Sequence, residues 1–317
     1  MRIFSAAAIR SIATPDLVIA SVRGALIDHA HGNIASPPPV HLHFAEPQGD
    51  CHIKSGHAAG SRVFVIKVAT SFHGNSDMGL ASGNGLMLVL SAETGAPLAL
   101  LADDGWLTDA RTAAAGALAV EACAPAATDM LGVLGAGTQA LFQARRICAH
   151  NGIARVAVWS RTASSVQRLV HELRAAGLEA IPCDSPSEVA AQARAIVTCT
   201  PSRVPLLKAV DLDHVRLIVA VGADMPGKRE LDPDVIDRAD RIVCDDIALC
   251  LDHGEIQGRR LHHTRLMQLG DLLAAPEIAN TGLTVVDLTG LAAQDVGVAS
   301  EVYRRLCTSI PASGGSH

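Results

Sequence analysis

The sequence has few of the features that mark several classes of protein. Aromatic residues make up only 3% of its 317 residues, so buried cores must be built from Ala, Val, Leu and Ile. Its apolar runs are shorter than the ~18 residues that a membrane-spanning helix needs. Lys and Arg form no basic stripe of the kind that binds nucleic acid. We therefore expect neither a membrane span nor a nucleic-acid partner.

Signals of secretion and of metal binding are also lacking. The opening residues, MRIFSAAAIR, contain no apolar segment of signal-peptide length and no small-residue cleavage site. The eight cysteines form no C-x-x-C pair, which predicts reduced packing residues rather than a disulfide framework. His41 and His43 share one strand face and His262 is adjacent to His263, but no Cys or acid stands at ligand spacing from them. We expect a cytoplasmic globular protein without a metal.

Apolar residues, at 49% with 18% charged residues, are ample for buried cores, and the length predicts about two domains. The first third has the pattern of an antiparallel sheet, in which short β-rich runs alternate with Gly, Asn, Ser and Asp. A helix over residues 15–31 precedes these runs, and Glu93-Thr94-Gly95 predicts a hairpin turn between the last two. The predicted strands are 50–54, 62–70, 85–91 and 97–102.

An Ala-rich helix is predicted from about Leu107, with Thr108 as its candidate N-cap, and we expect it to link the two domains. Beyond residue 129, buried β-branched runs alternate with helices over 138–150 and 163–176, which indicates a parallel sheet covered on both faces. A last helix over 296–308 is expected to fold back onto the first domain, with a frayed tail after it. The predicted strands of the parallel sheet are 130–135, 155–160, 195–200, 216–222, 241–246 and 283–288.

The expected fold class is therefore α/β, with a Rossmann-type doubly wound parallel sheet and a smaller α+β domain. The smaller domain is expected to comprise residues 1–115 together with a C-terminal helix at about 300–317, and to bind the substrate. Residues 116–299 are expected to form the NAD(P)-binding domain.

A dinucleotide fingerprint, Gly135-x-Gly137-x-x-Ala140, lies directly between a predicted buried strand and a helix, as the motif requires. Gly135 permits the tight turn, and Gly137 lets the backbone approach a pyrophosphate at the helix N-terminus. The alternative is an ordinary strand-to-helix turn. The candidate cofactor-binding residues, here and near later strands, are Gly135, Ala136, Gly137, Thr138, Gln139, Ser160, Arg161, Thr162, Thr200, Pro201, Val221, Gly222 and Thr112.

The end of the next strand bears on which cofactor is bound. NAD enzymes usually place Asp or Glu there to accept a hydrogen bond from the ribose 2′-hydroxyl, but this strand ends Trp159-Ser160-Arg161-Thr162. Arg161 can pair with a 2′-phosphate, with Ser160 and Thr162 as further donors; the alternative is a solvated surface Arg. The sequence favours NADP(H), with NAD(H) possible.

Three polar residues are candidates for the reaction itself. Asp224 follows a buried strand, and ligands of open α/β sheets bind beyond such strand ends. It can exchange a proton with a substrate nitrogen or cap the next helix. Lys67 lies within VFVIKVAT, where it is costly unless it faces water or a polar pocket. Arg111 can clamp a carboxylate with two parallel hydrogen bonds.

Taken in order, Lys67, LTDARTAAAG, GAGTQA and GADMPGKRELD resemble the ornithine cyclodeaminase/mu-crystallin family over about residues 35–305. The resemblance implies a Rossmann domain joined to a substrate-binding sheet domain that forms a homodimer. It also implies that Lys67 and Arg111 hold the substrate carboxylate and polarise its Cα region. Asp224 would be the acid/base near the substrate nitrogen, and the loop at Gly290 would border the nicotinamide.

The chain departs from the family pattern in the substrate pocket. Many relatives carry an Arg on the early strand where this chain has Val40-His41-Leu42-His43. They also tend to have a Met-Pro-Ala-like segment where this chain reads His52-Ile53-Lys54-Ser55-Gly56. We hypothesise that His41 or Lys54 supplies the missing positive charge to a substrate-binding site.

The resemblance leaves several activities open, all on a small amino or imino acid. Cells generally hold NADP pools reduced, so an NADPH-leaning site favours reduction, and the altered pocket weakens an assignment to ornithine. We expect reduction of a small cyclic imino acid, of the Δ1-pyrroline-2-carboxylate type, to the amino acid by hydride transfer. The alternatives are ornithine cyclodeamination with recycled NAD⁺, an alanine-dehydrogenase-like reaction, and a crystallin-like ligand-binding protein.

Overall fold

The computed structural model describes residues 1–262, 265–275 and 282–309. Its contacts divide the chain into two units, Met1–Arg111 with Ala292–His317, and Thr112–Leu291. The tail expected to fray and His263 lie outside the described residues. Among the helices that are described, none has the length and apolar character needed to cross a membrane.

The first unit contains a seven-stranded sheet with the order β1-β7-β6-β5-β4-β2, in which β3 also pairs with β4. The predicted antiparallel pairings are confirmed, and β1 adds a parallel pairing with β7 that the sequence did not predict. The turn at Glu93-Thr94-Gly95 joins β6 to β7, and Gly95 has a φ of 70°. The strands are β1 (Arg2–Ser5), β2 (Ile34–Ala35), β3 (Val40–Phe44), β4 (Gly49–Ala58), β5 (Val63–Phe72), β6 (Gly83–Ser91) and β7 (Pro97–Ala102).

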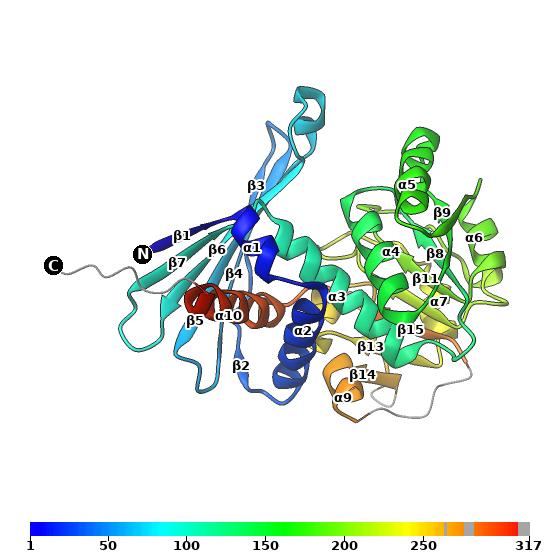
Figure 1. The fold of residues 1–317 in the computed structure, drawn as a ribbon. Helices are drawn as coiled ribbons and strands as arrows, with labels where there is room; N and C mark the ends of the chain where they lie inside the picture. Colours follow the sequence, from blue (N-terminus) through cyan, green and yellow to red (C-terminus); the bar gives the residue numbers. More distant parts are fainter. Residues whose placement is uncertain (263–264, 276–281, 310–317) are drawn as a thin grey trace. The chain divides into compact units, whose positions relative to one another are not determined.

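One face of this sheet is covered by α10 (Ala292–Ser309), which crosses β4 to β7 and packs against α2 (Pro15–Ala30) (Figure 1). Gly297 permits the close approach of the two helices, because a Cβ there would lie 2.8 Å from both the Ala25 Cβ and the Ser21 carbonyl oxygen. Residues 292–299, expected in the dinucleotide-binding half, therefore form the first turns of a helix in the first unit. The short helices α1 (Ala6–Ile12) and η1 (His73–Met78) complete the unit.

Helix α3 (Trp106–Cys123) contains the boundary between the units. The prediction that Thr108 is its N-cap is wrong. The helix begins two residues earlier, and the Asp103 carboxylate accepts the Leu107 N–H at 2.7 Å. Asp104 and Gly105 have φ values of 56° and 80°, and this left-handed turn brings Asp103 back to the helix end. Thr108 lies inside the first turn.

The second unit contains an eight-stranded sheet with the order β10-β9-β8-β11-β12-β15-β13-β14. Every pairing in it is parallel, which confirms the expected doubly wound α/β fold. The strands are β8 (Met130–Leu134), β9 (Arg155–Trp159), β10 (Glu179–Pro182), β11 (Ala195–Thr198), β12 (Leu217–Ala220), β13 (Arg241–Cys244), β14 (Leu266–Gln268) and β15 (Thr284–Asp287). The helices are α4 (Thr138–Asn151), α5 (Ala163–Ala175), α6 (Pro186–Gln192), η2 (Ala209–Asp211), α7 (Pro233–Arg238), α8 (Ile247–His253) and α9 (Leu269–Ala274).

The six strands predicted for this sheet are present, and the two that were missed, β10 and β14, lie at its edges. Edge strands are short and partly exposed here, so they lack the continuous apolar run that identifies a central strand. At the centre, Gly132 of β8 has no side chain because a Cβ would lie 2.6 Å from Val189 of α6. The absence of a side chain at Gly132 therefore permits close packing of α6 on β8.

Candidate functional site

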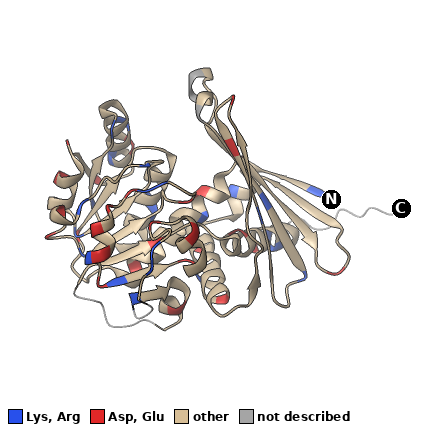
Figure 2. Ribbon diagram, turned by 180° about the vertical axis from the view of Figure 1, so that it is seen from behind, with Lys and Arg blue, Asp and Glu red and all other residues tan. Residues whose placement is uncertain are grey.

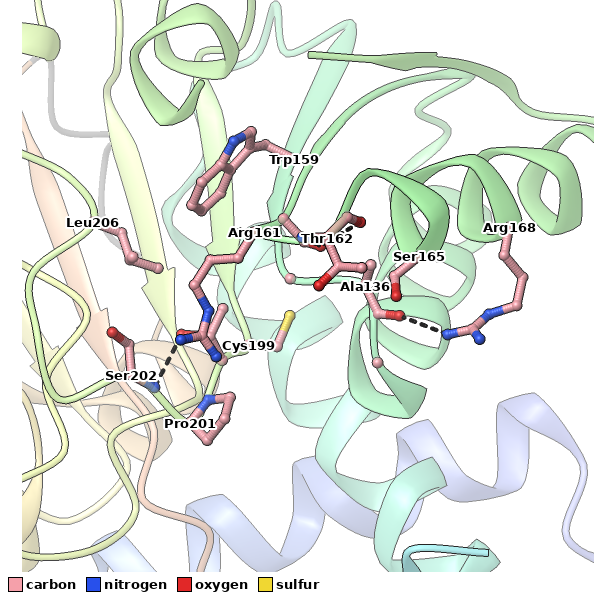
Figure 3. A pocket seen from close by; sticks show the side chains of 14 residues that line it. Ala136, Trp159, Arg161, Thr162, Ser165, Arg168, Cys199, Pro201, Ser202 and Leu206 are labelled. Carbon is pink, nitrogen blue, oxygen red and sulfur yellow. Dashed lines mark hydrogen bonds between the residues drawn. The ribbon is translucent and has the colours of Figure 1, made fainter. Parts of the chain in front are cut away.

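A pocket lies where β8 is flanked by β9 on one side and β11 on the other (Figure 3). The strand order reverses at this point, which is where open α/β sheets bind dinucleotides. Residues at or after the carboxyl ends of these three strands provide its walls. They are Gly135, Ala136, Gly137, Trp159, Ser160, Arg161, Thr162, Ser165, Arg168, Cys199, Thr200, Pro201, Ser202 and Leu206.

The two fingerprint glycines serve different needs. Gly135 has a φ of 126°, and a Cβ there would lie 2.7 Å from the Cys199 carbonyl oxygen, so the protein's own fold requires glycine. At Gly137 the φ is −91° and a Cβ would meet nothing within 4 Å. Gly137 is also the N-cap of α4 and gives no side-chain hydrogen bond to it. Open space beside uncapped N–H donors fits a pyrophosphate approaching the backbone.

Two arginines line this pocket: Arg161 points toward Ser202 and Pro201, and Arg168 points toward Ala136 of the glycine loop (Figure 3). Arg161 follows β9, and the backbone beside it is held by the Ser160 hydroxyl, which accepts the Thr162 N–H at 3.3 Å. Arg168, on α5, donates to the Ala136 carbonyl oxygen at 3.5 Å. Both arginines are exposed. Sequence reasoning missed Arg168 because it lies on a helix beyond the motif, on the same face as Ser165.

Some predicted cofactor residues lie outside the set that lines this pocket. Thr138 and Gln139 begin α4 directly behind the glycine loop. Val221 and Gly222 follow β12, and the Gly222 N–H donates to Glu230. The carbonyl oxygen of Thr112 accepts from Gln143 at 3.0 Å.

In the first unit, Lys67 and Arg111 meet at a carboxylate that the sequence did not reveal, Asp295 of α10. The Lys67 Nζ lies 2.9 Å from one Asp295 oxygen, and the Arg111 Nε lies 3.0 Å from the other. Arg111 also donates to the Gln294 side-chain oxygen at 2.8 Å. The three charged side chains are 2–5% exposed. Lys67 is thus on the buried face of β5, which explains a lysine within an apolar strand.

Burial dominates the electrostatics of this basic cluster, which we define as Lys67, Arg111 and Asp295. Burial lowers the pKa of Lys67 to about 7, against the opposing effect of Asp295. Burial alone would raise the pKa of Asp295, but Arg111 and Lys67 outweigh it and the pKa lies below its ordinary value. The cluster therefore combines a fixed ion pair with an ammonium group that can release its proton near neutrality.

Lys54 and His41 lie on the same sheet face as Lys67. Lys54 is the direct cross-strand partner of Lys67, and its charge lowers the pKa of Lys67 further. His41 is paired with His52, and their rings meet edge to face with centroids 4.4 Å apart. Positive and titratable groups thus continue along β4 and β3 from the basic cluster.

Asp224 and Gly290 each have a fixed environment in the second unit. Asp224 follows β12 and accepts from the Lys228 Nζ at 2.6 Å, with 41% of its side chain exposed. Gly290 has a φ of 77°, and its N–H donates to Asp245 at 2.7 Å. Lys228 was not singled out from sequence, and it reaches Asp224 through a turn and not along a helix.

Four further carboxylates of this unit are buried: Asp287, which ends β15, and three in loops that the sequence did not single out, Glu230, Asp245 and Glu255. Burial raises the pKa of Glu255 to about 8 and that of Asp287 to about 7. It also raises the pKa values of Glu230 and Asp245. Acids within loops give no pattern in the sequence by which burial can be recognised.

Charged residues of both signs are interspersed over the ribbon, and the long strands of the first unit carry few of them (Figure 2). In the part of the chain that the structure describes, no group of His, Cys, Asp and Glu is arranged to hold a metal ion. All eight cysteines are free thiols, as predicted.

Comparison with known proteins shows which family has this sequence and fold. The model of the ornithine cyclodeaminase/mu-crystallin family matches residues 2–309. The chain belongs to this family. Among curated members, it is 33% identical to an uncharacterized cyclodeaminase of Sinorhizobium fredii over 86% of this chain and 85% of that one. It is also 33% identical to the alanine dehydrogenase of Archaeoglobus fulgidus over 93% and 92%.

Other family members that match have reductase names. They are the iminosuccinate reductase of Paracoccus denitrificans, mouse ketimine reductase mu-crystallin and the Δ1-pyrroline-2-carboxylate reductase of Bacillus cereus, at 26–28% identity. Among solved structures of the family, an archaeal alanine dehydrogenase dimer with bound NAD has a TM-score of 0.88 and 30% identity, covering 100% of this chain and 98% of that chain. The fold expected from the resemblance is therefore confirmed.

Proposed function

We propose that the protein is an NAD(P)H-dependent reductase of a small cyclic imino acid, of the Δ1-pyrroline-2-carboxylate type. The observation that carries this proposal is the pocket at the strand-order reversal, with open backbone at Gly137 and the exposed side chains of Arg161 and Arg168 in its lining. Relatives with imino-acid reductase names support the reaction class, and the NAD-bound alanine dehydrogenase supports a nicotinamide cofactor.

Residues of this pocket fit a dinucleotide in a defined orientation. The Gly135–Gly137 loop and the N–H groups of α4 would hold the pyrophosphate. Arg161 would pair with a ribose 2′-phosphate, since guanidinium groups bind phosphate with two parallel hydrogen bonds. NADP(H) is therefore the preferred cofactor, and NAD(H) remains possible. A bound reduced nicotinamide supplies the hydride.

The proposed substrate residues divide the remaining tasks. Arg111 and Lys67 bind the substrate carboxylate, with Lys54 or His41 adding positive charge. Asp224 delivers the proton to the imine nitrogen while hydride reaches the adjacent carbon, and the Gly290 loop borders the nicotinamide. Changing Asp224 to Asn should lower kcat by on the order of 10²–10⁴-fold if it transfers this proton. An unchanged kcat would exclude Asp224 from the mechanism.

We also propose that the first unit binds the substrate and forms a homodimer, and that the second binds the cofactor. Strand alternation places Ile3, Val40, Leu42 and Phe44 on the sheet face opposite α10, where they are 39–67% exposed. A large exposed apolar surface of this kind marks an association site, and a second copy of the same sheet would cover it. Sedimentation analysis of the purified protein tests this proposal.

The decisive experiment follows NADPH absorbance with purified protein and Δ1-pyrroline-2-carboxylate, with NADH and the six-membered ring analogue in parallel. Rapid oxidation of NADPH is the expected result. Equal rates with NADH would exclude the role given to Arg161. Turnover of ornithine with NAD⁺, in place of any ketimine reduction, would instead support the cyclodeaminase reaction. Cofactor binding without turnover of any of these substrates would favour a ligand-binding protein.

A further inference from the structure

Glu230 is a carboxylate that is fully excluded from solvent. None of the proposed roles in binding or catalysis uses it. One of its oxygens accepts from both the N–H and the hydroxyl of Thr200, each at 2.7 Å. The other accepts from the Thr198 hydroxyl at 2.6 Å and from the Gly222 N–H at 2.9 Å. Four donors thus surround the two oxygens of one carboxylate.

These bonds join the ends of two neighbouring strands. Thr198 is the last residue of β11 and Thr200 follows it, whereas Gly222 follows the adjacent strand β12. Thr200 and Gly222 lie beyond Thr198 and Ala220, the last paired residues of the two strands. Their backbone N–H groups therefore need acceptors other than a neighbouring strand. A Cβ at Gly222 would collide with the Thr200 carbonyl oxygen and lie 2.6 Å from the Glu230 carboxyl carbon. The sequence therefore provides glycine where the carboxylate and the two loops meet.

The loop that Glu230 holds is one wall of the dinucleotide pocket. This wall consists of Cys199, Thr200, Pro201, Ser202 and Leu206. Its backbone is also attached to the segment around Glu230, because the Arg229 N–H donates to Ser202 O and the Leu206 N–H donates to Glu230 O. The backbone of this segment and the Glu230 side chain therefore both hold the wall in place through hydrogen bonds.

A second buried acid fixes Glu230 itself. Glu255 accepts the backbone N–H groups of Glu230 and Leu231 at 2.7 and 3.1 Å. The Glu230 carboxylate in turn depends on hydroxyl and N–H donors, and each donor that is lost leaves a buried charge with less compensation. A small shift of this group must therefore move Thr200, which lines the pocket.

We infer that Glu230 is a positioning residue that sets the pocket wall at Thr200 for the nicotinamide dinucleotide. The inference rests on the proposed function of this pocket. Glu230 does not line the pocket, so it acts through Thr198, Thr200 and Gly222. Its effect should therefore depend on the hydrogen bonds of the carboxylate and not on contact with the cofactor.

Thr198 offers the sharpest test, because its side chain is fully buried, bonds Glu230 and lies outside the pocket lining. The dissociation constant for NADPH is measured by nucleotide fluorescence for the unmutated protein, Thr198→Val, Thr198→Ser and Glu230→Gln. We expect binding to weaken several-fold in Thr198→Val and at least tenfold in Glu230→Gln. Thr198→Ser, which keeps the hydroxyl, should bind as the unmutated protein does.

A double variant separates positioning from a general loss of stability. Thr198→Val should weaken binding no further in a protein that already carries Glu230→Gln, since both changes break the same connection. Ile236→Ala is the stability control, because Ile236 is a buried core residue of α7 in the same unit, away from the pocket lining. It should lower the melting temperature without changing NADPH affinity.

Two results would overturn the assignment of Glu230. One is unchanged NADPH affinity in Thr198→Val and Glu230→Gln; the other is equal loss in Thr198→Val and Thr198→Ser. If Glu230→Gln does not fold, the two Thr198 variants still decide the matter. An unmutated protein that binds neither NADPH nor NADH would refute the proposed function itself, and the role of Glu230 with it.

Discussion

In the first unit, the buried charges form a mixed group, with Lys67 and Arg111 both in contact with Asp295. In the second unit, the Glu230 and Glu255 carboxylates instead accept hydrogen bonds from hydroxyl and backbone N–H groups. Charge compensates charge in the first case, and neutral donors compensate charge in the second. The pKa directions differ accordingly, since that of Asp295 is lowered and those of the two glutamates are raised.

This difference has consequences for what each unit can do. An ion-paired carboxylate holds two buried cationic side chains in place beside each other. A carboxylate with neutral donors fixes the loops at the end of a sheet through hydrogen bonds from hydroxyl and backbone N–H groups. The first arrangement suits recognition of an acid substrate, and the second suits a rigid cofactor site.

The largest effect should come from removing the carboxylate of the basic cluster. Asp295→Asn leaves Lys67 and Arg111 buried together without their counter-ion, which should lower the free energy of unfolding by ~3–5 kcal/mol. Urea denaturation measures this change. Glu301→Gln is the matched control on the same helix, because Glu301 pairs with Arg304 and Arg305 at the surface and should cost less than ~1 kcal/mol. Equal losses would show that burial does not distinguish the two.

Two buried groups, Asp287 and Lys67, should affect the pH dependence of stability with opposite signs. Asp287 has a folded pKa of about 7, raised by burial from 3.8, so the folded state keeps a proton that the unfolded state releases. Its stabilisation is complete below about pH 4 and is lost as the pH rises to about 7, at up to ~1.4 kcal/mol per pH unit. Lys67, lowered to about 7 from 10.5, has the opposite effect, and stability rises above pH 7.

Asp287→Asn tests the acid side of this expectation. The amide cannot titrate, so the decrease in unfolding free energy between pH 4 and 7 should become smaller in the variant. Unfolding is followed by circular dichroism at half-unit intervals of pH. A variant whose stability falls as steeply as that of the unmutated protein would show that Asp287 is not the titrating group.

The two arginine-containing sites should respond to substitution independently. Arg161→Ala should reduce the preference for NADPH over NADH by about tenfold, because a charge-assisted bond to a 2′-phosphate is lost. Arg111→Lys should raise the KM for the imino acid by a similar factor, since lysine cannot form the paired hydrogen bonds of a guanidinium. Steady-state kinetics with both cofactors measures each ratio. An Arg111→Lys effect on cofactor preference would contradict this division.

Local patterns in the sequence predicted the glycine loop, the central strands and the fold class. These features depend on neighbouring residues, such as a continuous apolar run before Gly135-x-Gly137. The partners of the predicted residues were not predicted, because they are distant in the chain. Arg111 and Asp295 are 184 residues apart, and Glu230 is 30 residues from Thr200. Only the fold brings such groups together, so the acids that fix the candidate sites were missed.

The N-cap of α3 shows the same limitation over a shorter distance. Thr108 has the residue type and place of an N-cap, but the left-handed turn at Asp104 and Gly105 brings Asp103 to the helix end instead. Asp103 is buried, and burial raises its pKa to about 6. It is thus a carboxylate of the first unit that is compensated by a backbone donor, as those of the second unit are.

This capping bond should give the smallest of these effects. Asp103→Ala should lower the free energy of unfolding by ~1–2 kcal/mol, the usual cost of losing a cap, and so by less than Asp295→Asn. Thr108→Ala should cost less than half as much as Asp103→Ala. Urea denaturation of the three variants under one condition orders them. If Asp103→Ala were as costly as Asp295→Asn, a buried carboxylate with neutral donors would be as critical as an ion-paired one, and the distinction between the two kinds of compensation would not hold.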